Sequence, residues 1–202
     1  MNGKTHTAAG IACSITAAYA AAPDALSIPV LALGSAAAVM ASTLPDCDLY
    51  ENNMKAALQC MVQLAVFCIL SQWLTQNPAN WQYALFFIVV IFMGAMTSHR
   101  SMTHSIVALF AFSWLFYVMI GENRTITLWF FIAYASHLVL DVLNKRGEML
   151  LWPFTSERFC LKLSKSESKL GDLIFRAASI WYIAALAWIL FQKYGQMWIS
   201  RA

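Results

Sequence analysis

Charged side chains are scarce in this sequence. Lys, Arg, Asp and Glu make up 11% of its 202 residues, apolar residues make up 60%, and the mean hydropathy is +0.61. A soluble domain usually has about 25% charged and 45–50% apolar residues. The chain has too few polar residues to cover its own surface in water, so we expect a lipid bilayer to be its solvent.

Two further absences exclude other classes of protein. The net charge is only +3, and the aromatic residues lie within apolar runs instead of alternating with basic residues, so we expect no binding to nucleic acid. The cysteines are odd in number and form no CxxC pair, which favours neither a disulfide framework nor a zinc–thiolate site. They are Cys13, Cys47, Cys60, Cys68 and Cys160.

Long uncharged runs predict an all-α, polytopic membrane helix bundle. Residues 56–98 contain no charged residue and no histidine, and the Asn-Pro turn in "NPANW" divides this run into two spans. The Ala-rich N-terminal third reads as two more spans whose small residues allow close helix packing. We expect seven spans, with six as the alternative, in a single integral membrane domain of residues 1–202. The spans are about 6–22, 28–44, 56–75, 81–97, 105–120, 126–143 and 173–192.

The basic residues predict the orientation of these spans. The segment 144–172 is the densest basic region, so the positive-inside rule makes it a cytoplasmic loop and places the N-terminus inside. We expect the acidic residues of this loop to balance its lysines; they are Glu148, Glu157, Glu167 and Asp172. A cleaved signal peptide at the start is less favoured, because Gly10, Ser14 and Thr16 interrupt its apolar stretch.

This orientation, derived from Lys and Arg alone, also sorts the other ionisable residues. All four histidines and three aspartates fall at predicted cytoplasmic ends of spans, where we expect a polar, metal-type cluster. They are His6, Asp46, Asp48, His99, His104, His137 and Asp141. Ionisable groups in a membrane segment are costly, so they are functional candidates by default.

The residue types in this group are those that bind metal ions. His137 and Asp141 are four residues apart on one predicted helix and therefore share a face. In "LPDCD" (44–48) Pro45 ends a span, and two aspartates on an extended turn can bracket a cation. Imidazole and carboxylate suit Zn²⁺, Mn²⁺ or Fe, and the number of candidate ligands allows one metal ion or two.

Other residues near the candidate ligands suggest a phosphate-containing substrate. Arg100, in "HRSMTHS" (99–105), has the planar fork that binds phosphate. Thr5 and Thr103 each precede a candidate histidine and can hydrogen-bond a ligand or substrate. The alternative for each single histidine is an amphipathic residue at the membrane interface, without a bound metal.

The motifs, in their order, resemble the bacterial inner-membrane metal-dependent hydrolase family typified by YdjM. That family has an N-terminal His followed by "LPDiD", "HRgxTHS", "sHlxxDxl" and "G…lLWP". This chain has His6, "LPDCD", "HRSMTHS", "SHLVLDVL" and "GEMLLWPF" over roughly residues 1–155. Members often have a His directly after the second Asp of the "PDxD" motif, where this chain has Leu49.

The resemblance implies a membrane-embedded hydrolase with a divalent-metal site, for which we expect Zn²⁺ or Mn²⁺. The seven His and Asp residues would be the metal ligands. Asp48, His104 and Arg100 would be catalytic, with metal-activated water attacking a phosphoester or lipid-linked substrate at the cytoplasmic leaflet of the inner membrane. Some members of the family are described as associated with the LexA repressor.

Two other functions stay open from the sequence. One is a membrane-tethered regulatory protein that engages an acidic partner or anionic lipid through residues 158–169. The other is a metal or proton transporter, although transporters place polar groups near the bilayer midplane. We expect contacts with membrane lipids, and the sequence predicts no oligomeric state.

Overall fold

The structure is a computed structural model that describes residues 3–48, 53–75, 79–96, 101–145, 147–162 and 169–195. These residues form seven α-helices and three short helical segments, with no strand among them. The α-helices are α1 (Gly3–Ala21), α2 (Ile28–Thr43), α3 (Asn53–Thr75), α4 (Trp81–Ala95), α5 (Ile106–Met119), α6 (Arg124–Val142) and α7 (Lys169–Leu190). The short segments are η1 (Pro23–Ala25), η2 (Pro45–Asp48) and η3 (Phe191–Gly195). Each α-helix coincides with one predicted span to within a few residues, so the all-α prediction is confirmed.

Polar residues at the predicted boundaries begin three of these helices. The side chain of Ser105 accepts a hydrogen bond from the Ala108 amide at 3.0 Å, and that of Asn123 accepts one from Ile126 at 3.1 Å. Ser27 begins α2 in the same way. Such caps bind amide groups that the first helical turn leaves without partners. Because Ser105 follows His104 directly, its cap places a candidate ligand at the start of α5.

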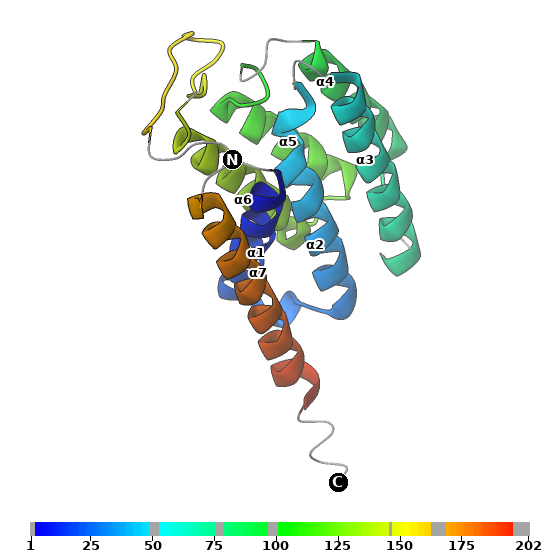
Figure 1. Ribbon diagram of the computed structural model, residues 1–202. Helices are drawn as coiled ribbons and strands as arrows, with labels where there is room; N and C mark the ends of the chain where they lie inside the picture. Colours follow the sequence, from blue (N-terminus) through cyan, green and yellow to red (C-terminus); the bar gives the residue numbers. More distant parts are fainter. Residues whose placement is uncertain are drawn as a thin grey trace.

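The helices α1, α2 and α6 form the centre of the bundle (Figure 1). Glycines allow them to approach closely: a Cβ atom at Gly34 of α2 would lie 2.6 Å from the ring of Trp129 on α6. Ser14 of α1 donates a hydrogen bond to the carbonyl oxygen of Trp129 at 2.8 Å. The small residues of the N-terminal third therefore pack as the sequence predicts.

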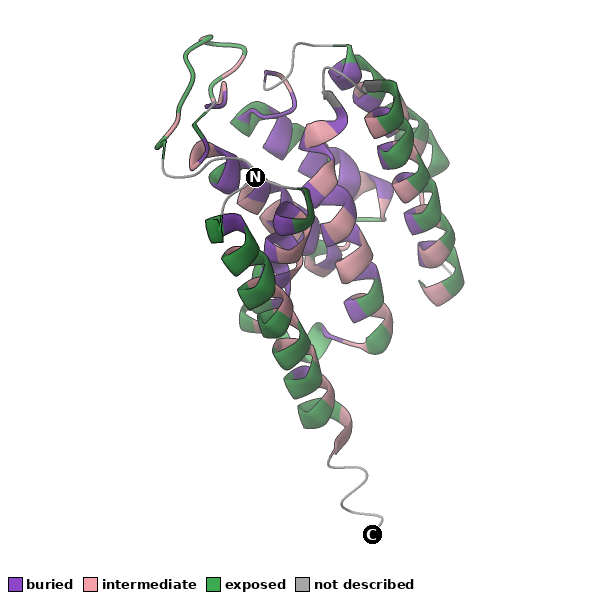
Figure 2. Cartoon of the chain, in the orientation of Figure 1, coloured by how far each residue is buried: buried purple, intermediate pink, exposed green. Residues whose placement is uncertain are grey.

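The outer helices expose apolar side chains, as expected for a surface in contact with lipid. Figure 2 shows α7 largely exposed along its length, and its large side chains Ile180 and Trp181 are 69% and 57% exposed. Three helices are long and apolar enough to cross a membrane: Met54–Thr75, Arg124–Val142 and Lys169–Gly195. The helices α2, α4 and α5 are apolar but shorter. The number of α-helices thus equals the predicted number of spans. The match is only rough in length, because three of the helices are long and apolar enough to cross a membrane.

The segment after α6 folds back onto the end of the bundle instead of forming only an open loop. Glu148 and Phe159 pair through two backbone hydrogen bonds of 3.0 and 2.9 Å, and the amide of Ile106 donates to the carbonyl oxygen of Leu150 at 2.9 Å. Glu148 is fully buried. Glu148 is therefore enclosed by the folded segment instead of lying on the surface of a loop.

Candidate metal centre

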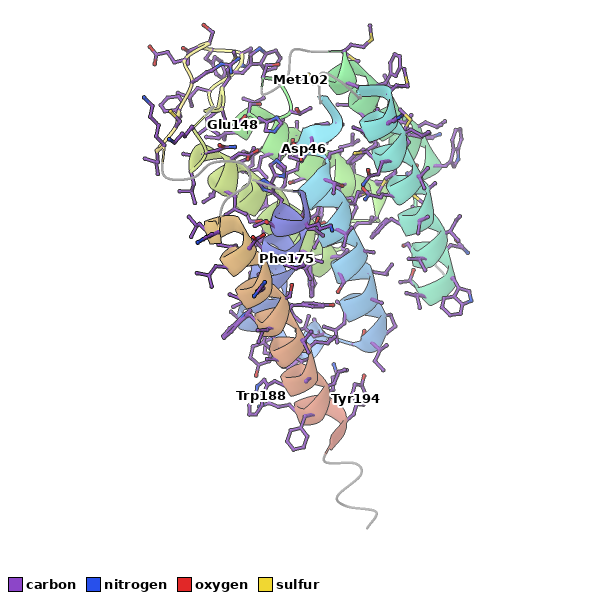
Figure 3. The ribbon with its side chains drawn as sticks, in the orientation of Figure 1. Asp46, Met102, Glu148, Phe175, Trp188 and Tyr194 are labelled. Atoms are coloured by element: carbon purple, nitrogen blue, oxygen red, sulfur yellow. The ribbon has the colours of Figure 1, made fainter. Side chains whose placement is uncertain are left out.

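Five of the predicted ligands come together at one end of the bundle. His6 lies in the first turn of α1, Asp46 in η2, His104 just before α5, and His137 and Asp141 in the last turns of α6. Asp46 is labelled at this end in Figure 3. The four other side chains are at most 2% exposed, whereas that of Asp46 is 28% exposed. The cluster is thus buried among the helix ends and opens to the outside at Asp46.

Asp141 lies at the centre of this cluster. Its Oδ2 is 3.2 Å from Nε2 of His137 and 3.7 Å from Nε2 of His104, and its Oδ1 is 3.3 Å from Nε2 of His6. Asp46 Oδ1 lies 3.7 Å from Nε2 of both His104 and His137. One nitrogen or oxygen from each of Asp46, His104, His137 and Asp141 lies within 4.8 Å of the other three.

These spacings fit a single divalent cation. Zn²⁺ binds nitrogen and carboxylate oxygen at about 2.0–2.2 Å in a tetrahedron, which separates its donor atoms by about 3.3–3.6 Å. The nitrogen–oxygen distances of 3.2–3.7 Å lie around this range, and most exceed those of a direct hydrogen bond. The buried Nε2 of His137 makes no hydrogen bond. A metal ion would bind this nitrogen through its lone pair.

His6 lies beside these four donors and not among them. Its ring stacks on that of His137 with a centroid distance of 4.1 Å, and its Nδ1 is buried without a hydrogen bond. Because His6 and His137 face different oxygens of Asp141, this carboxylate can bridge two neighbouring cation positions. The geometry therefore suits one metal ion at the four donors. Through the bridging carboxylate of Asp141 it is also compatible with the predicted alternative of two metal ions.

Hydrogen bonds outside the cluster orient two of the histidines. Nδ1–H of His137 donates to the carbonyl oxygen of Ser42 at 2.7 Å. Thr103 donates its single hydroxyl hydrogen to the carbonyl oxygen of Pro45 at 2.9 Å, so it accepts from Nδ1–H of His104 at 3.3 Å. Both bonds use Nδ1 and leave Nε2 facing the cluster, which is the arrangement that a metal-binding histidine requires.

The histidines also keep Asp46 ionised. Burial by itself raises the pKa of this carboxyl group, but the charge interactions with the neighbouring rings of His137 and His104 outweigh burial and lower the pKa below its usual value. Asp46 is therefore a carboxylate at neutral pH, and it is the most exposed donor of the cluster. It can bind a cation and accept a proton from a molecule that enters there.

The sequence comparison identifies the family. The profile of the YdjM inner membrane protein family matches residues 1–199. The chain belongs to this family. Two relatives, each named "Inner membrane protein YdjM", come from Escherichia coli (strain K12) and Shigella flexneri, and each is 24% identical over 198 residues, which cover 91% of this chain and 82% of the relative. No solved structure matches the chain.

Membership of the YdjM family supports the expectation of a membrane protein, since both relatives are named inner membrane proteins. The family match also extends further along the chain than the motifs do. The motifs end near residue 155, whereas the matched region includes α7. The helix α7 is therefore part of what the family shares, and not an addition to a shorter common core.

Some of the predicted site residues have no described position in this YdjM-family chain. His99, Arg100 and the side chain of Asp48 lie outside the described residues. Thr5 does not contact a ligand: its hydroxyl donates to the carbonyl oxygen of Gly171 at 3.3 Å and attaches α1 to α7. The segment of Asp46 is a 3₁₀ turn and not extended. Alternate residues of a 3₁₀ turn do not point the same way, so the predicted extended arrangement of this segment is wrong.

Three contributors to the site were missed by the sequence analysis. The carbonyl oxygens of Ser42 and Pro45 orient histidines, but a backbone group has no signature in the sequence. The hydroxyl of Tyr134 donates to the carbonyl oxygen of Thr103. Tyr134 was open to prediction, because it lies three residues before His137 and so shares its helix face.

We expect Thr103→Val to weaken metal binding about 10–100-fold without removing a ligand. Valine has the shape of threonine but cannot accept the Nδ1–H of His104 or bond to Pro45, and losses of this kind typically have that effect on affinity. Competition with a fluorescent chelator would measure the change. Thr103→Ser keeps the hydroxyl and serves as the control. Equal weakening by both variants would show that the methyl group matters and not the hydrogen bond.

Proposed function

We propose that this chain is a membrane-embedded, metal-dependent hydrolase that acts on a phosphoester or lipid-linked substrate at the cytoplasmic leaflet. The observation that supports this most is the set of four donor atoms from Asp46, His104, His137 and Asp141 within 4.8 Å of one another. Zn²⁺ or Mn²⁺ held there would lower the pKa of a bound water molecule to about 7 and supply the nucleophile.

The residues of the chain have separate tasks in this proposal. Asp46 is ionised and accessible, so it accepts a proton as water attacks phosphorus and returns it to the departing alcohol. The water oxygen forms the new bond to phosphorus, and the bond from phosphorus to the alcohol oxygen breaks. His104, His137 and Asp141 would hold the ion together with one oxygen of Asp46, whose other oxygen accepts the proton. Arg100 binds the phosphate, and Asp48 completes the site, as the sequence predicts.

We also propose a multi-pass topology with the N-terminus and this cluster at the cytoplasmic side. The basic segment after α6 lies at the same end of the bundle as the cluster, since Leu150 is hydrogen-bonded to Ile106, two residues after His104. The positive-inside rule makes that end cytoplasmic. A cluster at one end, and not at the middle of the helices, favours a hydrolase over a transporter.

A hydrolysis assay tests the proposed function. Purified protein in detergent micelles, supplied with Zn²⁺ or Mn²⁺, should release alcohol from a chromogenic alkyl phosphate. We expect Asp46→Ala to lower this rate about 100-fold or more, since it removes the proton acceptor, while the three buried ligands remain. Asp24→Ala, which removes an exposed carboxylate from η1, should retain the wild-type rate. Equal rates in the wild type and Asp46→Ala with each metal would contradict the proposal.

The exposed basic residues support a second candidate function. Arg158, Lys162 and Lys169 are all exposed, and Phe154 of the same segment is 82% exposed. Such a surface suits a regulatory protein that holds an acidic partner or anionic lipid at the membrane. Under this proposal, replacing the three basic residues would abolish function while Asp46→Ala would leave it intact.

A further inference from the structure

A groove of about 830 Å³ lies among α1, α2, α3 and α7. Its polar lining includes Lys4, Thr43 and Gln59, and its apolar lining includes Ala8, Ile11 and Ile183. Figure 3 labels Phe175, which lines the groove from α7 beside the first turns of α1. The groove is thus a mainly apolar space on the side of the bundle, with a cationic residue in its wall.

The polar part of the groove lies at the same end of the bundle as the candidate metal centre. Lys4 and His6 occupy the same turn of α1, where Lys4 is exposed and His6 is 1% exposed. Thr43 lies between Ser42, whose carbonyl oxygen binds His137, and Asp46. The wall of the groove and the cluster are therefore neighbours along the chain at this end of the bundle, and Thr43 lies three residues before Asp46.

The length of the groove matches one leaflet of a bilayer. Its lining extends along α1 from Lys4 to Ile11 and along α7 from Phe175 to Ile183. At a rise of 1.5 Å per residue these stretches are about 10–12 Å long. The hydrocarbon core of a bilayer is about 30 Å thick, so one leaflet is about 15 Å. A chain that enters beside Lys4 would stay within the leaflet of the metal centre.

We propose that this groove holds one hydrocarbon chain of a phosphate-bearing lipid, with its headgroup at Lys4, at the end of the bundle where the metal centre lies. The positive charge of Lys4 complements the phosphate, and the apolar wall complements the chain. The assignment of this lipid as the substrate rests on the proposed hydrolase function. Binding of the chain itself needs no metal ion, so the two proposals can fail separately.

Photolabelling of the full-length protein in detergent with a chelator present tests the groove alone. The probes are an alkyl phosphate and the matching alkyl alcohol, each with a diazirine near the end of the chain. We expect labels on the groove walls of α1 and α7. Ala8→Trp fills the groove and should lower labelling about tenfold or more. A tenfold loss of binding corresponds to the burial of only a few methylene groups of the alkyl chain of the probe.

Two further variants separate the chain from the headgroup. Ala20→Trp adds the same side chain to α1 at a different groove, between α1, α6 and α7, and should leave labelling unchanged. Lys4→Gln should weaken labelling by the phosphate probe but not by the alcohol.

Unchanged labelling in Ala8→Trp would overturn the proposal. A cross-link between two copies through Ser179→Cys would also overturn it, because it would place a second protein chain in the groove. Equal responses of Lys4→Gln to both probes would overturn the assignment of the headgroup.

Discussion

His137→Ala is expected to leave the purified protein without bound metal, where the wild type carries Zn²⁺ or Mn²⁺ in stoichiometric amount. The Nε2 atom of His137 lies 3.2 Å from Asp141 and 3.7 Å from Asp46, between the two carboxylates of the cluster. The side chain is fully buried, so water cannot easily take its place as a ligand. Altering a group that only orients a ligand costs about 10–100-fold in affinity, and loss of the ligand itself should cost about 100-fold or more.

Elemental analysis of protein purified in detergent measures this directly, with a chelator titration for the affinity. Thr5→Val is a suitable control, because Thr5 is buried next to His6 but hydrogen-bonds to Gly171 and not to the cluster. It should bind as much metal as the wild type. A wild-type protein that is natively folded and free of metal, even after incubation with Zn²⁺ or Mn²⁺, would refute the metal site.

Asp141→Ala is expected to destabilise even the metal-free protein, by about 3–5 kcal/mol. Asp141 is 2% exposed and lies within 3.3 Å of Nε2 of both His6 and His137. Asp141→Ala removes the carboxylate and leaves the buried His6 and His137 without their charged partner. Breaking a buried pair in this way typically lowers the free energy of unfolding by about that amount. Equilibrium unfolding in mixed micelles with a chelator present would measure the change.

Asp172→Ala provides the matched control for that experiment. Asp172 is an exposed carboxylate in the first turn of α7, and its loss should change the free energy of unfolding by no more than about 0.5 kcal/mol. Asp141→Asn keeps an acceptor oxygen and should have an intermediate effect. If Asp141→Ala unfolds like the wild type, the cluster is held by its surroundings and Asp141 contributes only ligand chemistry.

The helices of this protein were predictable because the bilayer imposes a simple constraint. Apolar runs must form helices that satisfy their own backbone hydrogen bonds, and the turns between them contain Pro, Asn and Gly. Five candidate ligands could be grouped at one end of the bundle, since alternate helix ends lie at the same end. The cysteines followed the expectation too: all five are described and all are free.

Other features could not be read from residue types. Glu148 belongs to a charged connecting segment, for which a solvent-exposed position is the usual expectation. The segment after α6 nevertheless folds back and buries its side chain. The sequence predicts an extended turn for the aspartates of "LPDCD", whereas Pro45 begins a 3₁₀ turn after α2. Both outcomes depend on how a connecting segment packs against the ends of several helices, and no local pattern encodes that.

The sequence by itself determined the class of this protein, the positions of its helices and the end of the bundle at which five of its ionisable residues gather. These properties depend on hydropathy and charge, which sum along the chain. Only the tertiary structure decided that His104 and His137 point their Nε2 atoms at two carboxylates, that Asp141 faces three histidines, and that the site opens at Asp46. Those properties depend on distances between separate helices, and they arise because small residues let α1, α2 and α6 pack closely enough for their ends to meet.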